Sequence, residues 1–318
     1  MGIFALPAML KRGYDKALST GSICSAGTLG ILIPPSIMLV IYGPMAGISI
    51  VQLFAGAFIP GLILATLFII YIFVRCLFNP TLGPPLPPEE RKMLLKKKLY
   101  LGITSILPPM FIILSVLGTI FFGIAAVTEA AAAGAFASII LTAAYRKLNW
   151  QILKSAAYRT LTISSMIMVI TFAAFVFTGA FMMIGGKHVV TNTLLGLPVP
   201  PWGMLVLMLF AYFFLGIFMD WIGIIPILVP LFTPIVMKLG FNPLWFGILA
   251  IVCMQTSFLT PPMAISLFYM KGVAPPEIDF MKHIVRGVIP FIGLQLIGLA
   301  LITIFPQLVL WLPNLLIR

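Results

Sequence analysis

Two proline pairs inside long apolar stretches are the residues of this sequence best suited to bind an ion. They are Pro34-Pro35 and Pro261-Pro262. A proline removes a backbone N–H and clashes with the preceding turn, so each pair predicts an interrupted helix. In hydrocarbon, an interruption is tolerated only where the freed carbonyl groups face protein, water or a bound ion. We therefore expect a cation at the two breaks, with a purely structural proline kink as the alternative.

The oxygen atoms at the two breaks come from main-chain carbonyls and hydroxyl side chains. At the first break they lie near Thr28, Gly30 and Ile33, and at the second near Ser257 and Thr260. Such oxygens suit sodium, and the partial charges at the ends of half-helices add to the attraction. No cofactor is expected beyond sodium as a coupling ion.

Asp220 is an acid deep in an apolar run, where a carboxylate is costly and is a functional candidate by default. The competing interpretation is that it caps the helix that follows. Glu129 stands at an expected helix start and is interpreted as a cap. No metalloprotease, nucleophile-elbow or phosphate-loop motif is present, so an enzyme is not predicted.

Helices that cross a membrane must position these residues. The 318-residue chain is 62% hydrophobic and 8% charged, which excludes a soluble domain and predicts an all-α polytopic membrane protein. Its net charge of +12 comes from basic residues between the apolar runs. Such residues mark cytoplasmic loops rather than a nucleic-acid surface.

The apolar runs divide the chain into a partial first repeat (1–75), a cytoplasmic linker (76–98) and a second repeat (99–318). The expected elements are a broken helix at 17–43, spans at 51–75, 99–118, 127–145 and 161–185, a re-entrant hairpin at 203–237, a second broken helix at 244–270, and a last span at 288–312.

The hairpin is inferred from length. A helix over 203–237 would reach roughly 50 Å, against a hydrocarbon core of about 30 Å, whereas two full spans need more residues. Two short legs with a tip at 216–220 fit this length. One long tilted helix is the alternative, and Pro226, Pro230 and Pro234 argue against it.

The repeat appears when the chain is shifted on itself by 227 positions, which places Pro34-Pro35 on Pro261-Pro262. The same offset aligns other helix breakers and loop residues: Pro7 with Pro234, Lys11 with Lys238, Gly13 with Gly240, Tyr14 with Phe241, and Tyr42 with Tyr269. Five expected crossings separate the two broken helices, an odd number, so the copies should face opposite ways. Inverted repeats with broken helices are typical of secondary transporters.

The first copy is expected to be incomplete, because only the descending leg of its hairpin (1–10) has a counterpart in the second copy. On the order of a hundred residues of the first repeat would then come from a longer gene product or from another polypeptide.

Five segments carry a resemblance to a known family: PAMLKRGY (7–14), GTLGILIPPS (27–36), TEAAA (128–132), GIFMD (216–220) and LTPP (259–262). They look like the corresponding segments of the large membrane subunit of TRAP transporters (DctM type), which begins further upstream. The resemblance implies a sodium-driven, elevator-type importer of a small organic anion such as a C4-dicarboxylate or a sugar acid. It would reside as a multi-pass protein in the bacterial inner membrane. Its implied partners are a small membrane subunit (DctQ type) and a periplasmic solute-binding protein (DctP type).

The resemblance also implies two sodium sites. The first would use Gly30, Ile33 and Pro35 and would be incomplete here; the second would use Asp220, Ser257, Thr260 and Pro262. Thr28 and Gly216 are expected to contact the substrate. Two alternatives stay open: a sodium/divalent-anion symporter that works without a binding protein, and a truncated remnant that does not transport.

Overall fold

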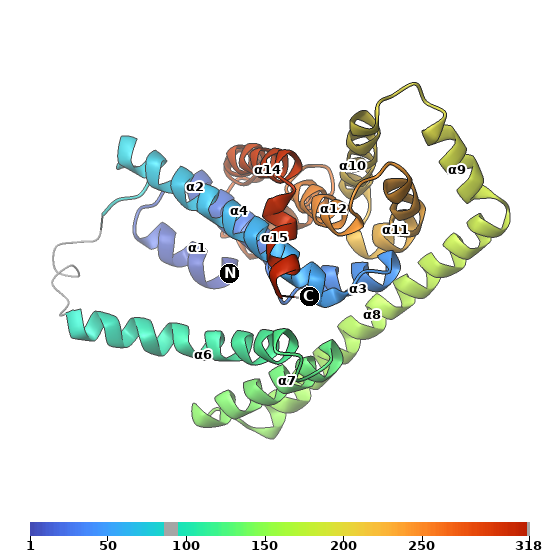
Figure 1. Ribbon diagram of the computed structural model, residues 1–318. Helices are drawn as coiled ribbons and strands as arrows, with labels where there is room; N and C mark the ends of the chain where they lie inside the picture. Colours follow the sequence, from blue (N-terminus) through green and yellow to red (C-terminus); the bar gives the residue numbers. More distant parts are fainter. Residues whose placement is uncertain (86–94, 317–318) are drawn as a thin grey trace. The chain divides into compact units, whose positions relative to one another are not determined.

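Helices form all the regular secondary structure of residues 1–85 and 95–316, which are the residues that the computed structural model describes (Figure 1). Within these residues, eight helical segments are long and apolar enough to cross a membrane, counting the two halves of the first broken helix together. The prediction of an all-α polytopic membrane protein is therefore confirmed.

The bounds of the helices are α1 Gly2–Lys11, α2 Lys16–Leu32, α3 Ile37–Ala46, α4 Ile50–Phe78, α6 Leu95–Phe121, α7 Val127–Ala144, α8 Trp150–Met183, α9 Gly186–Leu195, α10 Pro201–Phe218, α11 Trp221–Lys238, α12 Pro243–Ser257, α13 Ile265–Val273, the π-helical η1 Phe280–Val285, α14 Arg286–Ile304 and α15 Gln307–Leu316. Helix breaks stand at both proline pairs, and the break between α10 and α11 falls within the predicted tip at 216–220.

Three predicted boundaries differ from the observed ones. The last span, predicted at 288–312, is two helices. Phe305, with φ −117° and ψ 77°, leaves the helical conformation before Pro306, because a residue before proline is disfavoured in the helical region. The span predicted at 161–185 belongs to the longer α8, whose start is capped by the Asn149 carboxamide accepting from Ile152 N at 2.8 Å. In the predicted linker 76–98, α4 extends to Phe78, α6 begins at Leu95, and residues 86–94 lie outside the described part.

The chain divides into two compact units, 85–169 and a larger one made of 1–84 and 170–318. In the smaller unit, α6 and α7 pack as a helical pair. Gly134 of α7 faces Val116 of α6 with no room for a side chain between them. The Glu129 carboxylate accepts from Ala126 N at 2.9 Å and caps α7, as the sequence predicts.

One of the three prolines inside α11 is compensated by another helix of the larger unit. Pro230 has no N–H to offer to the carbonyl of Pro226, one turn earlier. The hydroxyl of Thr178 donates to that carbonyl instead, at 3.2 Å. A neighbouring helix therefore satisfies the backbone group that the proline releases, as membrane helices require.

In the larger unit, α2 and α14 run in the same direction. The hydroxyl of Thr20, near the start of α2, donates to the carbonyl of His283 at 3.0 Å. Further along both helices, Gln295 Nε2 donates to Thr28 Oγ1 at 3.2 Å. Because the residue numbers rise along both helices from the first contact to the second, α2 and α14 are parallel.

Helix α12 runs opposite to α14. The indole N–H of Trp245, near the start of α12, donates to the carbonyl of Ile302 at 2.8 Å. At the other end of α12, Gln255 shares the acceptor Thr28 Oγ1 with Gln295. Since α2 is parallel to α14, α12 is antiparallel to α2. Figure 1 shows α12 between α14 and α10.

Helix α4 also runs opposite to α14. The rings of Phe68 and Phe291 meet edge to face at 5.2 Å, and one turn back along α4, Leu64 fills the space over Gly298. At the 227-residue offset α12 corresponds to α2, and α14 follows α12 as α4 follows the first broken helix. Helix α12 therefore packs antiparallel to its counterpart α2, and α14 packs antiparallel to its counterpart α4.

Candidate ion and substrate site

The first break is held together by the side chain of Ser36. Helix α2 ends where Ile33 N donates to the carbonyl of Leu29 at 2.8 Å, and Ile33 itself is extended. Ser36 Oγ then donates to the carbonyl of Ile31 and accepts from Leu39 N at 3.5 Å, capping α3. One hydroxyl thus ties the end of one half-helix to the start of the next.

The Gly30 carbonyl loses its helical donor at this break. Its helical donor would be the N–H of Pro34, which does not exist. The Ile31 carbonyl likewise lacks a helical donor, because Pro35 has no N–H, but the Ser36 hydroxyl donates a hydrogen bond to it instead. Gly30 is exposed, and no other atom lies within 4 Å of where its Cβ would be. The break therefore has open space beside the α-carbon of Gly30, whose carbonyl lacks its helical donor.

At the second break the freed carbonyls are satisfied within the chain. Thr260 N donates to the carbonyl of Ser257 at 3.0 Å, and Ser266 N donates to that of Phe258 at 3.4 Å. The Thr260 hydroxyl donates to the Thr256 carbonyl at 3.0 Å, which leaves its lone pairs for another partner.

Ala264, between the second break and α13, has a φ of +25°. A residue with a Cβ rarely adopts this backbone conformation, and backbone strain of this kind is concentrated at functional sites. The sequence does not predict this feature, because alanine has no preference for a positive φ.

The tip between α10 and α11 contacts the second break directly. Met263 N donates to the carbonyl of Ile217 at 3.2 Å. Gly216 lies against Ser257 so closely that a Cβ on the glycine would collide with the serine Oγ, which donates to the Met254 carbonyl at 2.7 Å. The fold thus brings together two segments that are forty residues apart in the sequence.

Asp220 stands at the N-cap position of α11, and its backbone carbonyl accepts from Gly223 N at 3.0 Å and Ile224 N at 3.3 Å. Its side chain makes no capping hydrogen bond of ordinary geometry, although the carboxylate faces the amides of Trp221 and Ile222, so the capping alternative stays a prediction. The carboxylate oxygen Oδ1 is buried and has no hydrogen-bond partner among the described residues. A buried carboxylate oxygen in this state is suited to a cation.

Thr28 is buried at the contact of three helices. Its hydroxyl donates to the Ser25 carbonyl at 2.8 Å and accepts from Gln255 and Gln295 at 3.3 and 3.2 Å. Both glutamines are fully buried, and within the described residues neither Oε1 has a hydrogen-bond partner. Sequence reasoning missed them, although polar residues inside apolar runs are a signal that would have found them.

The predicted site residues form two equivalent sets. At the 227-residue offset, Gly30, Ile33 and Pro35 of the first break correspond to Ser257, Thr260 and Pro262 of the second. The second set lies beside the tip that carries Gly216 and Asp220, whereas Gly30 in the first set faces open space.

Comparison with known proteins gives one family. The model of the DctM component of tripartite ATP-independent periplasmic transporters matches residues 1–308. The C4-dicarboxylate TRAP transporter large permease proteins DctM of Vibrio cholerae and Pseudomonas aeruginosa are 29% and 30% identical over 99% of this chain, and the matches cover 72% and 71% of those proteins. The sialic acid TRAP transporter permease protein SiaT of Haemophilus influenzae is 31% identical over the whole chain and half of its own length.

Proposed function

Because this chain belongs to the family of DctM components of tripartite ATP-independent periplasmic transporters, we propose that it is the permease subunit of a sodium-coupled importer of a small organic anion. Relatives are named for C4-dicarboxylate and for sialic acid, both of which carry carboxylate groups. We place it in the bacterial inner membrane, beside a small membrane subunit and a periplasmic solute-binding protein. The tripartite family description supports these two partners.

The observation that carries the sodium assignment is the contact of the α10–α11 tip with the second break. It brings Gly216 and Ile217, which shortly precede Asp220 and its unpartnered Oδ1, against the segment that contains Ser257 and Thr260. Carboxylate, hydroxyl and carbonyl oxygens are the ligands that hard cations take. The proposed second sodium site therefore consists of Asp220, Ser257, Thr260 and the carbonyl of Pro262.

The proposed first site uses the carbonyls of Gly30, Ile33 and Pro35. Its support is the missing helical donor of Gly30 and the open space beside its α-carbon. Equivalent positions at the two breaks would then hold two sodium ions in one repeated geometry.

For the substrate, Gly216 stays the proposed contact, and Thr28, predicted as a second contact, is proposed to act indirectly. Gly216 is favoured by its place on the tip, because any anion bound beside the second break meets that backbone. The Thr28 hydroxyl is already engaged by three partners, so it acts on the substrate through the position of α2 rather than through a free oxygen.

Coupling requires that sodium and anion together favour a state that neither favours alone. An ion at the second break would hold the tip against the end of α12, and an anion would neutralise the positive charge that the bound sodium ions bring. Movement across the membrane in an elevator-type motion would then be permitted for the fully loaded or the empty carrier.

The test is uptake into proteoliposomes that contain the assembled transporter with its binding protein. Asp220→Ala and Thr260→Val should each lower the apparent sodium affinity and the number of sodium ions moved per substrate. Glu277→Gln, an exposed acid that is paired with Lys16, is the matched control. Unchanged sodium stoichiometry in both site variants would refute the assignment.

A further inference from the structure

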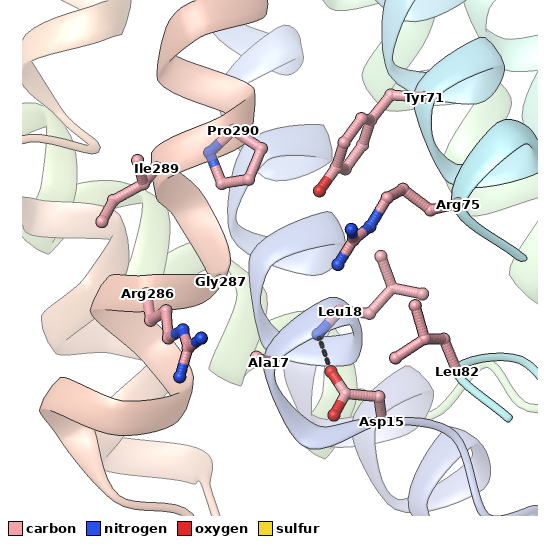
Figure 2. A pocket seen from close by; sticks show the side chains of 10 residues that line it. All are labelled: Asp15, Ala17, Leu18, Tyr71, Arg75, Leu82, Arg286, Gly287, Ile289 and Pro290. Carbon is pink, nitrogen blue, oxygen red and sulfur yellow. Dashed lines mark hydrogen bonds between the residues drawn. The ribbon is translucent and has the colours of Figure 1, made fainter. Parts of the chain in front are cut away.

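A pocket of about 330 Å³ opens between the starts of α2 and α14 and the end of α4 (Figure 2). Two arginines line it, Arg75 near the end of α4 and Arg286 at the start of α14. Figure 2 shows the side chains of Arg75 and Tyr71 reaching from α4 toward the other two helices. Within residues 1–85 and 95–316, neither guanidinium has a hydrogen bond or an ion pair.

The pocket carries an excess of positive charge. Its one acidic lining residue is Asp15, whose Oδ1 accepts from Leu18 N at 2.7 Å and caps α2. This carboxylate is therefore already engaged by the helix terminus. Two arginines against one aspartate leave a net charge of +1 in a partly enclosed space, which is a site for an anion.

The two helices at the pocket are fixed by a backbone contact. A Cβ on Gly21 would collide with the carbonyl of Gly287, and a Cβ on Gly287 would collide with the carbonyl of Ala17. Small residues of this kind let membrane helices approach closely. The pocket's shape is thus set by packed backbones rather than by mobile side chains.

The surface beside the pocket is apolar and exposed. At the end of α4, Phe78 stands three residues after Arg75 on the same helix face, and its exposed fraction is 84%. On α14, the exposed fraction of Ile289, which lines the pocket, is 58%. Lys11 and Lys16 lie at this end of α2, where basic residues mark the cytoplasmic side. A cationic pocket flanked by lipid-facing side chains is matched by an amphiphilic anion from the inner leaflet.

We propose that this pocket binds the phosphodiester headgroup of an anionic phospholipid, with its acyl chains along Phe78 and Ile289. The guanidiniums of Arg75 and Arg286 hold the phosphate from two sides, and the Tyr71 hydroxyl donates a further hydrogen bond. A soluble phosphate has the same headgroup chemistry, but it would leave the adjoining apolar surface without a partner.

The experiment uses the purified chain in detergent, titrated with phosphatidylglycerol, phosphatidylcholine or glycerol phosphate, and bound molecules are counted by native mass spectrometry. We expect the variant carrying Arg75→Gln and Arg286→Gln to bind phosphatidylglycerol about 30-fold more weakly, given about fivefold for each basic residue. The matched control carries Lys147→Gln and Arg159→Gln, which remove the same charge from exposed positions of the smaller unit and should leave binding unchanged.

Two further variants separate binding from folding. Arg75→Lys with Arg286→Lys keeps the charge and should recover most of the affinity, whereas Tyr71→Phe should cause a severalfold loss without changing the charge. Equal binding of phosphatidylglycerol by the wild type and the double glutamine variant would overturn the proposal. So would an equal loss in the control, or glycerol phosphate binding as tightly as the lipid.

Discussion

Gln255 Nε2 donates a hydrogen bond of 3.3 Å to Thr28 Oγ1, and the two residues are 227 positions apart, which is the offset of the internal repeat. Equivalent residues of two copies contact each other only where an axis that relates the copies passes between them. The axis of this pair of repeats therefore runs through a buried polar cluster. The antiparallel packing of α2 on α12 and of α4 on α14 is consistent with a two-fold relation.

The first prediction concerns this cluster. Thr28→Val removes the acceptor shared by Gln255 and Gln295 and leaves two buried amide groups without their partner. We expect a loss of about 1–3 kcal/mol in the free energy of unfolding, measured by thermal unfolding in detergent. The control is Thr66→Val, because the exposed Thr66 hydroxyl only donates to a carbonyl of its own helix. A variant as stable as the Thr66 control would contradict this account.

The second prediction concerns the crossing of α2 and α14. Gly287→Ala places a Cβ against the Ala17 carbonyl, so the backbones must separate. Overpacking of this kind costs about 1–3 kcal/mol, which should appear as a lower unfolding temperature. Gly293→Ala on the same helix is the matched control, because no atom lies within 4 Å of the new Cβ. Equal stability of the two variants would show that the crossing is loose.

The third prediction concerns the contact of the α10–α11 tip with the second break. Gly216→Ala sets a methyl group against Ser257 Oγ and should push the tip away. We expect uptake in the assembled transporter to fall roughly 5- to 150-fold, the equivalent of about 1–3 kcal/mol. Gly223→Ala is the control, since its Cβ meets only the flexible end of Met219 at 3.5 Å. Normal uptake by Gly216→Ala would argue against a role for this contact in transport.

The fourth prediction concerns pH at the start of η1. The hydrogen bond from Lys282 N, at 2.6 Å, lowers the pKa of the exposed Asp279 carboxyl below its ordinary value of 3.8. Because the folded pKa is depressed, the cap stabilises η1 fully above the ordinary value, and this contribution is lost as pH falls through the lowered pKa.

Hydrogen exchange at the Lys282 amide, compared with Asp279→Asn, measures this effect. Once the intrinsic pH dependence of exchange is subtracted, protection in the wild type should decline only below the ordinary pKa, and the asparagine variant should show no such decline. An identical pH dependence of protection in the two proteins would mean that the Asp279 carboxylate does not stabilise the start of η1.

Much of the fold followed from local chemistry. The two helix breaks stand at Pro34-Pro35 and Pro261-Pro262, because the lack of an N–H acts on the same chain within one turn. The capping by Glu129 is local in the same sense. The break at Pro306 has the same local cause, although the length of the apolar run around it predicts one span.

Other features could not be read from the order of residues. The side chain of Asp220 lies in an N-cap sequence yet makes no capping hydrogen bond of ordinary geometry, and Ala264 is strained although alanine fits any helix. Both stand next to the contact of the tip with the second break, which joins segments about forty residues apart. No local propensity encodes that contact, so the order of residues did not show that Asp220 Oδ1 is without a partner among the described residues.

The sequence by itself determined that this is a helical membrane protein with a doubled, proline-broken unit, because hydrophobic run length and missing N–H groups act locally. Only the tertiary structure decided that Thr28 meets Gln255 and Gln295, and that Gly21 meets Gly287. Those contacts join residues more than 200 positions apart, and they depend on how α2, α12 and α14 pack together.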